Sequence, residues 1–147
     1  HAADREGYPI PQDLPDRLIV GPERARRQLT SLIEGARSSI RLIDPKVSDP
    51  ELTKLLEARR LEGLTVEVHG AKKLNGLKSH GKLMLIDNRI AVVGSLALAA
   101  LSLDFRREVA LAIEHRPAVS AIARMFDAVA TPKAIPKDAR AAGTGRC

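Results

Sequence analysis

Short strand-like runs alternate with helical patterns through most of the 147-residue chain, and this alternation is what most restricts its fold. Apolar or alternating runs at 17–20, 38–44, 64–70 and 107–114 predict strands. Helical patterns separate the first three runs, and another helical pattern covers 117–130. Strands that alternate with helices predict an α/β fold in which helices flank a β-sheet on both faces.

The helical patterns carry apolar stripes and, in one case, clear end signals. Apolar residues recur at helical spacing from Ala25 to Ala36 in the first pattern. In the second, Ser48 and Glu51 have the spacing of a capping box, and Gly63 predicts a left-handed residue after the last turn. The stripe of the third consists of Val119, Ile122, Phe126 and Val129. Each helix therefore has one side suited to packing on the sheet.

The segment 78–95, KSHGKLMLIDNRIAVVGS, predicts two strands joined by a turn at Asp87–Arg89. Hairpin strands are antiparallel, so we expect a mixed sheet rather than a parallel one. Side chains two positions apart on a strand share a face, so His80 and Lys82 project together. Residues 97–104 fit a short helix and a loop equally well.

The length of the chain corresponds to one domain. We expect an extended lead-in with three prolines at 1–16, a folded domain at 17–130 and a loose C-terminal tail at 131–147. The first residue is His1 rather than methionine, so a processed form and one half of a longer, two-lobed protein are both open. The only cysteine is Cys147, which excludes an internal disulfide and the Cys-rich zinc sites.

The formal net charge of +6 favours anionic partners such as phosphate esters, nucleic acid or acidic lipid headgroups. Aromatic residues make up only 2% of the chain, which argues against a base-stacking platform. No apolar run reaches the roughly 18 to 20 residues of a membrane span, so any membrane contact is expected to be peripheral. Neither charge nor cysteine content indicates a particular compartment.

The hairpin carries residue types that suit phosphoryl chemistry. A neutral imidazole at His80 is a nucleophile able to attack phosphorus, and the Lys82 ammonium can offset charge on the phosphoryl oxygens. Gly94 permits close backbone approach, and the Ser95 hydroxyl is a hydrogen-bond donor. Glu108 is a candidate for orienting the imidazole. Taken singly, these residues also fit a solvated strand face and an ordinary strand end.

Their combined spacing, His-X-Lys-X4-Asp-X6-Gly-Ser, resembles the HKD motif of the phospholipase D superfamily, and the resemblance extends over about residues 18–130. The positions that match the motif are His80, Lys82, Asp87, Gly94 and Ser95. The resemblance implies a mixed sheet with flanking helices and a phosphodiesterase or phosphatidyl transferase that needs no metal or other cofactor.

Carried over residue by residue, the resemblance makes His80 the nucleophile, or the general acid in a partner half-site. It implies that Lys82 and Ser95 bind the substrate phosphate and that Glu108 hydrogen-bonds His80. Asp87 is expected to support the loop rather than to touch substrate, and Gly94 is likewise structural.

One position departs from the family pattern. The family continues Gly-Ser-X-Asn, whereas Ala97 stands in the place of the asparagine. Loss of one donor that stabilises developing charge can lower the rate by roughly 10²–10³. The site is therefore weakened, or another donor compensates, the candidates being Arg106, Arg107 and Lys78.

The family mechanism uses two histidines, whereas this chain has one copy of the motif, and His69 is expected to be a surface or structural residue. We therefore expect a homodimer with a two-fold axis through the site, or a second HKD lobe. The substrate is expected to be a phosphodiester, either a phospholipid or a nucleic acid, since the basic loop with Lys72, Lys73 and Lys78 suits both. The alternatives are an endonuclease and a degenerate module that binds phosphate without turnover.

Overall fold

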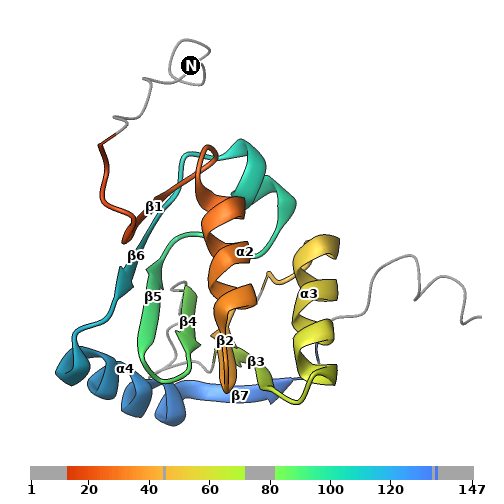
Figure 1. Cartoon of the computed structure of the whole chain (residues 1–147), viewed down its shortest axis with the longest axis vertical. Coiled ribbons are helices and arrows are strands. Elements are labelled where there is room, and N and C mark those ends of the chain that lie inside the picture. Colours follow the sequence, from red (N-terminus) through yellow and green to blue (C-terminus); the bar gives the residue numbers. More distant parts are fainter. Residues whose placement is uncertain (1–12, 45, 72–81, 134, 136–147) are drawn as a thin grey trace, which may run out of the picture.

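The structure is a computed structural model that describes residues 13–44, 46–71, 82–133 and 135. Its centre is a seven-stranded sheet with the strand order β1-β6-β5-β4-β2-β3-β7 (Figure 1). The strands are β1 (Leu18–Val20), β2 (Ser39–Ile43), β3 (Thr65–Ala71), β4 (Lys82–Ile86), β5 (Ile90–Gly94), β6 (Val109–Ile113) and β7 (Ala130–Lys133). Among these strands β2 and β3 are parallel, and every other pair is antiparallel.

Helices cover both faces of the sheet (Figure 1). The helices are α2 (Ala25–Gly35), α3 (Pro50–Leu61), the short π-helix η1 (Leu101–Phe105) and α4 (Arg116–Val129). α2 and α3 lie side by side on one face, and α4 crosses the other (Figure 1). The predicted α/β class, a mixed sheet with helices on both faces, is confirmed.

Each face of the sheet has its own apolar core. The larger core joins α2 and α3 to the sheet, with Leu29, Ile33 and Leu56 packed against Ile40 and Leu42. The smaller core lies under α4, where the fully buried residues are Phe126 and Leu85 and the nearly buried ones are Val119 and Leu83. The apolar stripes seen in the sequence are therefore the inner sides of α2 and α4.

Helix α3 begins one residue later than the sequence predicted. The capping residue is Asp49, whose carboxylate accepts the N–H of Leu52 at 3.0 Å, whereas the predicted cap, Ser48, donates its hydroxyl to the carbonyl of Lys46. Ser and Asp are almost equally good caps, so two adjacent candidates cannot be ranked by residue type. At the other end Gly63 has φ of +106°, the left-handed conformation that was predicted.

Three further local features refine the sequence analysis. The hairpin turn lies at the predicted place, with Asp87 and Asn88 at φ of 56° and 51°, a region that Asp and Asn tolerate. The ambiguous segment contains η1. Strand β7 lies where a loose tail was expected and pairs antiparallel with β3. A four-residue run that contains Pro132 gives a weak strand signal, and proline is accommodated here because β7 is an edge strand.

Candidate functional site

A pocket of about 140 Å³ opens at the end of the sheet where β4 begins and β5 ends. Its lining residues are Lys46, Lys82, Ser95, Ala97, Ala99, Leu101, Ser102, Arg106 and Glu108. Three of the predicted site residues, Lys82, Ser95 and Glu108, thus meet around one cavity. The predicted nucleophile His80 lies outside the described residues, two positions before Lys82.

Strand register explains why these residues meet. Lys82 is paired with Gly94 across β4 and β5, and Gly94 is paired with Ala110 across β5 and β6. The start of β4, the end of β5 and the start of β6 therefore lie side by side. Ser95 directly follows the end of β5, and Glu108 directly precedes the start of β6. Both residues therefore lie at the same edge of the sheet as Lys82.

Gly94 is needed for the packing of two strands. A Cβ atom at this position would lie 2.3 Å from the carbonyl oxygen of Val109 and 2.5 Å from the Cα of Ala110. The backbone that approaches Gly94 closely is therefore strand β6. Ser95 continues the same contact, since its N–H donates to the Val109 carbonyl at 3.0 Å and its hydroxyl lies 3.2 Å from the Val109 nitrogen.

A buried carboxylate joins two loops behind the pocket. Asp44, which is 6% exposed, follows β2 and accepts the N–H groups of Lys46 and Leu98, both at 2.8 Å. The Leu98 carbonyl in turn accepts the N–H groups of Ser48 and Asp49, both at 2.9 Å. Burial raises the pKa of Asp44, although the two N–H donors and the positive charge of Lys82 act against that rise. The loop after β2 and the loop after β5 are thus one connected unit.

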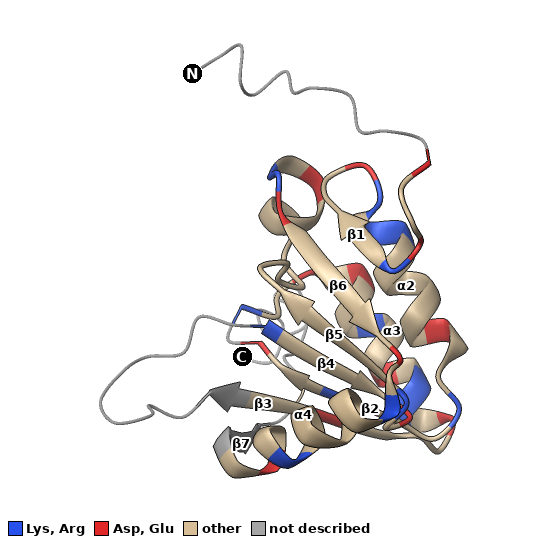
Figure 2. Cartoon of the chain, turned by 90° about the vertical axis from the view of Figure 1, so that its left-hand side faces the viewer, with Lys and Arg blue, Asp and Glu red and all other residues tan. Residues whose placement is uncertain are grey.

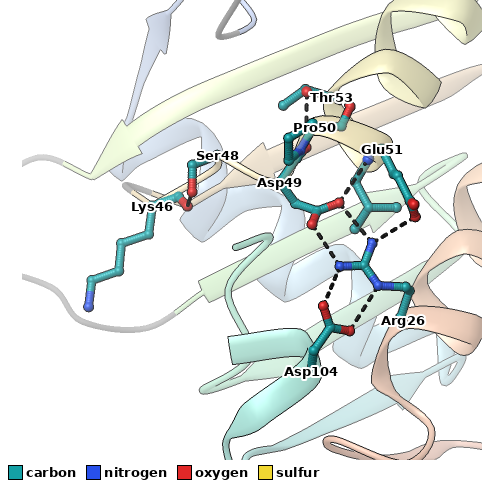
Figure 3. A network of polar contacts seen from close by, with 9 residues as sticks. Arg26, Lys46, Ser48, Asp49, Pro50, Glu51, Thr53 and Asp104 are labelled. Atoms are coloured by element: carbon teal, nitrogen blue, oxygen red, sulfur yellow. Dashed lines mark hydrogen bonds and ion pairs between the residues drawn. The ribbon is translucent and has the colours of Figure 1, made fainter. Parts of the chain in front are cut away.

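An arginine fixes η1, which forms one wall of the pocket (Figure 3). The guanidinium of Arg26 on α2 bonds to the carboxylate of Asp49 at 2.7 and 2.9 Å and to that of Asp104 at 2.7 and 2.9 Å. It also bonds to Glu51 at 3.0 Å. Arg26 lowers the pKa of Asp104. Burial acts to raise the pKa of Asp49, but Arg26 and the N–H groups of Leu52 and Glu51 together outweigh it and lower that pKa. These bonds connect α2, the start of α3 and η1.

Residues of η1 itself also hold it in place. The hydroxyl of Ser102 accepts the N–H of Ala97 at 2.9 Å, and Leu103 is fully buried in the larger core. Ala97 itself is 3% exposed and lines the pocket. The position at which the family pattern has asparagine is therefore one of the positions that line the pocket.

Sequence similarity to a known family covers a large part of this site. The family model described as "Cardiolipin synthase, PLD-like domain" matches residues 65–130, which include β4, β5, β6 and η1. Residues 65–130 therefore match a phospholipase D-like domain. The matched segment contains every residue that lines the pocket except Lys46, and the resemblance to the phospholipase D superfamily that the motif spacing suggested is confirmed.

Solved structures share the fold of this chain. The domain is similar to NucT from Helicobacter pylori, with a TM-score of 0.67 and 18% identity over 79% of this chain and 97% of that chain. It is similar to Nuc from Salmonella typhimurium, a phospholipase D family member, with a TM-score of 0.68 and 17% identity over 79% and 95%. Polyphosphate kinase from Porphyromonas gingivalis has a TM-score of 0.69 and 16% identity over 83% of this chain and 23% of that chain. A comparison with curated proteins finds no match.

Asp87 of the phospholipase D-like domain lies at the opposite end of the hairpin from the pocket. Its carboxylate accepts the N–H groups of Arg37, Ser38 and Ser39 at 2.7 to 3.0 Å, and the Ser38 hydroxyl donates to it at 2.9 Å. Burial acts to raise the pKa of Asp87, but these donors outweigh it and hold that pKa below its ordinary value. Its contacts tie the β4–β5 turn to the segment between α2 and β2.

The structure distinguishes between the residues that were candidates to replace the asparagine amide missing at Ala97. Arg106 lines the pocket, whereas Arg107 bonds to the Glu23 carboxylate at 2.5 and 2.9 Å and to the Gly21 carbonyl at 3.1 Å. Arg107 is therefore occupied elsewhere, and Lys78 lies outside the described residues. Lys46, which sequence reasoning did not select, is a third cation in the pocket beside Lys82 and Arg106.

His69 of the domain is a buried residue of β3. Its Nε2 atom lies 3.0 Å from the Glu67 carboxylate, and its ring meets the Phe126 ring edge-on at 4.9 Å between centroids. The Arg41 guanidinium stacks over the same Phe126 ring at 4.5 Å. His69 thus packs in the interior under α4 and does not line the pocket.

The described part of the chain holds neither a cluster of metal ligands nor a membrane-spanning helix. No group of three or more His, Cys, Asp or Glu side chains is arranged there to hold a metal ion. None of the helices in those residues combines the length and apolar character that crossing a membrane requires.

Proposed function

We propose that this chain is a phosphodiester hydrolase or phosphatidyl transferase that acts through a covalent phosphohistidine at His80. The observation that carries the proposal is the meeting of Lys82, Ser95 and Glu108 around one pocket, at the edge of the sheet that directly follows His80 in sequence. The match to a phospholipase D-like family and the fold shared with Nuc support it.

In the proposed reaction the His80 imidazole attacks phosphorus, and the bond between phosphorus and the leaving alcohol oxygen breaks. The histidine of a second half-site gives the leaving oxygen its proton. Water or an acceptor alcohol then attacks the phosphohistidine, and the P–N bond breaks to free His80. Lys82 and Ser95 bind the phosphoryl oxygens throughout, and Glu108 orients the imidazole.

A second copy of the chain is the proposed source of the other half-site. Val93, Val109 and Leu111 are 38%, 46% and 41% exposed, and together they form an uncovered face on strands β5 and β6. α4 lies across the lower ends of the strands, and no helix among the described residues covers this face (Figure 2). The uncovered face adjoins Ser95, which bonds to Val109, so a copy docked there by a two-fold axis would reach the pocket.

The experiment is hydrolysis of a generic aryl phosphodiester by wild type, His80→Ala and Lys82→Met, with His115→Ala as the matched control because His115 is exposed and outside the pocket. We expect a loss of at least about 10²-fold for the first two variants and no change for the control. Native mass spectrometry should show a dimer. Equal rates for wild type and His80→Ala would remove His80 from the mechanism.

Ala97 favours a second candidate, a module that binds phosphate-bearing partners without turnover, because the pocket lacks a donor that the family pattern supplies. The variant Ala97→Asn separates the two candidates. A large rise in rate identifies a weakened enzyme, and an unchanged rate in an active wild type indicates that another group, with Arg106 as the first candidate, fills the role. Phosphodiester binding without turnover in both proteins supports the module. The endonuclease alternative predicts cleavage of DNA or RNA in preference to phospholipid.

A further inference from the structure

η1 holds two large apolar side chains in solvent beside the pocket. Leu101 is 59% exposed and Phe105 is 74% exposed, and they lie about one turn apart on the same short helix. Leu101 is itself one of the residues that line the pocket. An apolar patch at the mouth of a polar site is a common sign of an interaction surface.

The exposure of this pair is a built feature of the domain. The residues between them are held inward, since Leu103 is fully buried and Ser102 bonds to the backbone of Ala97. Asp104 is fixed by two hydrogen bonds from Arg26 (Figure 3). η1 is therefore an anchored platform that presents Leu101 and Phe105 at a fixed place.

The charges around the platform are positive where they face the pocket. Arg106 follows Phe105 directly, is exposed and lines the pocket, as do Lys46 and Lys82. The acid of the platform, Asp104, is compensated by Arg26, and Glu108 is the acid among the pocket-lining residues. Apolar side chains next to cations match the boundary of an anionic bilayer, where acyl chains lie just beneath phosphate groups.

We infer that Leu101, Phe105 and Arg106, here called the apolar rim, dock the domain on the surface of an anionic phospholipid bilayer with the pocket facing the headgroups. The orientation of the pocket rests on the proposed function, whereas docking itself does not require catalysis. The apolar rim lies on η1 and on the residue that follows it, next to α2, so it is separate from the uncovered face of β5 and β6 (Figure 1). A nucleic acid fits the rim less well because Phe105 is the one aromatic ring in it, whereas a stacking platform offers successive aromatic side chains.

The test is co-sedimentation of the whole chain with vesicles of phosphatidylcholine alone and of phosphatidylcholine mixed with phosphatidylglycerol. We expect wild type to bind the anionic vesicles and the double variant Leu101→Ser/Phe105→Ser to bind them about tenfold more weakly or less. Leu61→Ser is the matched control, since Leu61 is 74% exposed at the far end of α3 and should bind as wild type does. Arg106→Gln should weaken binding most at low salt.

Each outcome decides the inference. Absence of wild-type binding to anionic vesicles, or undiminished binding of the double variant with an unchanged urea unfolding midpoint, overturns it. A double variant that keeps vesicle binding but changes native mass or oligonucleotide binding would assign the rim to a second copy or to nucleic acid and also overturns it. His80→Ala should bind vesicles as wild type does. Unchanged hydrolysis in His80→Ala together with retained vesicle binding would contradict the proposed function and leave the inference standing.

Discussion

Replacement of Gly94 by alanine should destabilise the sheet at the edge that carries the pocket. The new Cβ would lie 2.3 Å from the Val109 oxygen, 2.5 Å from the Ala110 Cα and 2.9 Å from the Ala110 Cβ. Carbon atoms in ordinary contact are about 3.5–4 Å apart, so β6 would have to move by about 1 Å. The obstructing atoms are mostly backbone, and β6 is paired with both β1 and β5, so it cannot swing aside as a side chain can.

Overpacking of this kind costs about 1–3 kcal/mol, and a weakened ladder bond costs about 1 kcal/mol more. We therefore expect Gly94→Ala to lower the free energy of unfolding by about 3 kcal/mol, measured by urea denaturation followed by circular dichroism. Gly35→Ala is the control, because no atom lies within 4 Å of its Cβ position at the end of α2, and it should be neutral or stabilise by up to about 1 kcal/mol. Equal urea midpoints for Gly94→Ala and wild type, with equal slopes, would refute the close strand approach.

Two further variants test the bonds that tie the elements together. Asp87→Ala leaves the N–H groups of residues 37–39 without their acceptor. We therefore expect the free energy of unfolding, measured by urea denaturation, to fall by about 2–3 kcal/mol. A fall below 0.5 kcal/mol, roughly the effect of an ordinary surface substitution, would contradict the contact. Because Arg26 lowers the pKa of Asp49 and Asp104 below 3.8, its stabilisation should be complete above about pH 4 and lost as pH falls through the lower folded-state values. Arg26→Gln should therefore lower the free energy of unfolding at pH 7 by about 1 kcal/mol, because the ion pairs with Asp49 and Asp104 are partly exposed. In acid the stabilities of variant and wild type should become equal. A constant difference at every pH would count against the ion pairs.

The hairpin and its surroundings were predictable because local rules determine them. The turn at Asp87 and Asn88 sets the register of β4 and β5, and the register brings Lys82 next to Gly94. Where local rules were evenly balanced, they failed. Asp49 and Ser48 are adjacent caps of similar quality, and only the folded backbone distinguishes them.

The rest of the site depends on topology that the sequence does not display. Arg26 lies 78 positions before Asp104, and Asp44 lies 54 positions before Leu98, so their bonds exist only once the sheet is assembled. Gly94 is another residue whose contacts depend on the assembled sheet. The motif spacing drew attention to this glycine, but the backbone that approaches it becomes visible only with β6 in place.

The backbone hydrogen bonds of Leu98 help to determine the shape of the pocket, whereas the side chains that line the pocket determine its chemistry. The loop that includes Ala97 is positioned by main-chain atoms and by the buried Asp44, so the side chains that it offers to the cavity are free to vary. A lineage can therefore exchange residues such as the one at Ala97 without removing the main-chain bonds that position the loop. The same scaffold is in this way open to gaining, losing or changing an activity by single substitutions.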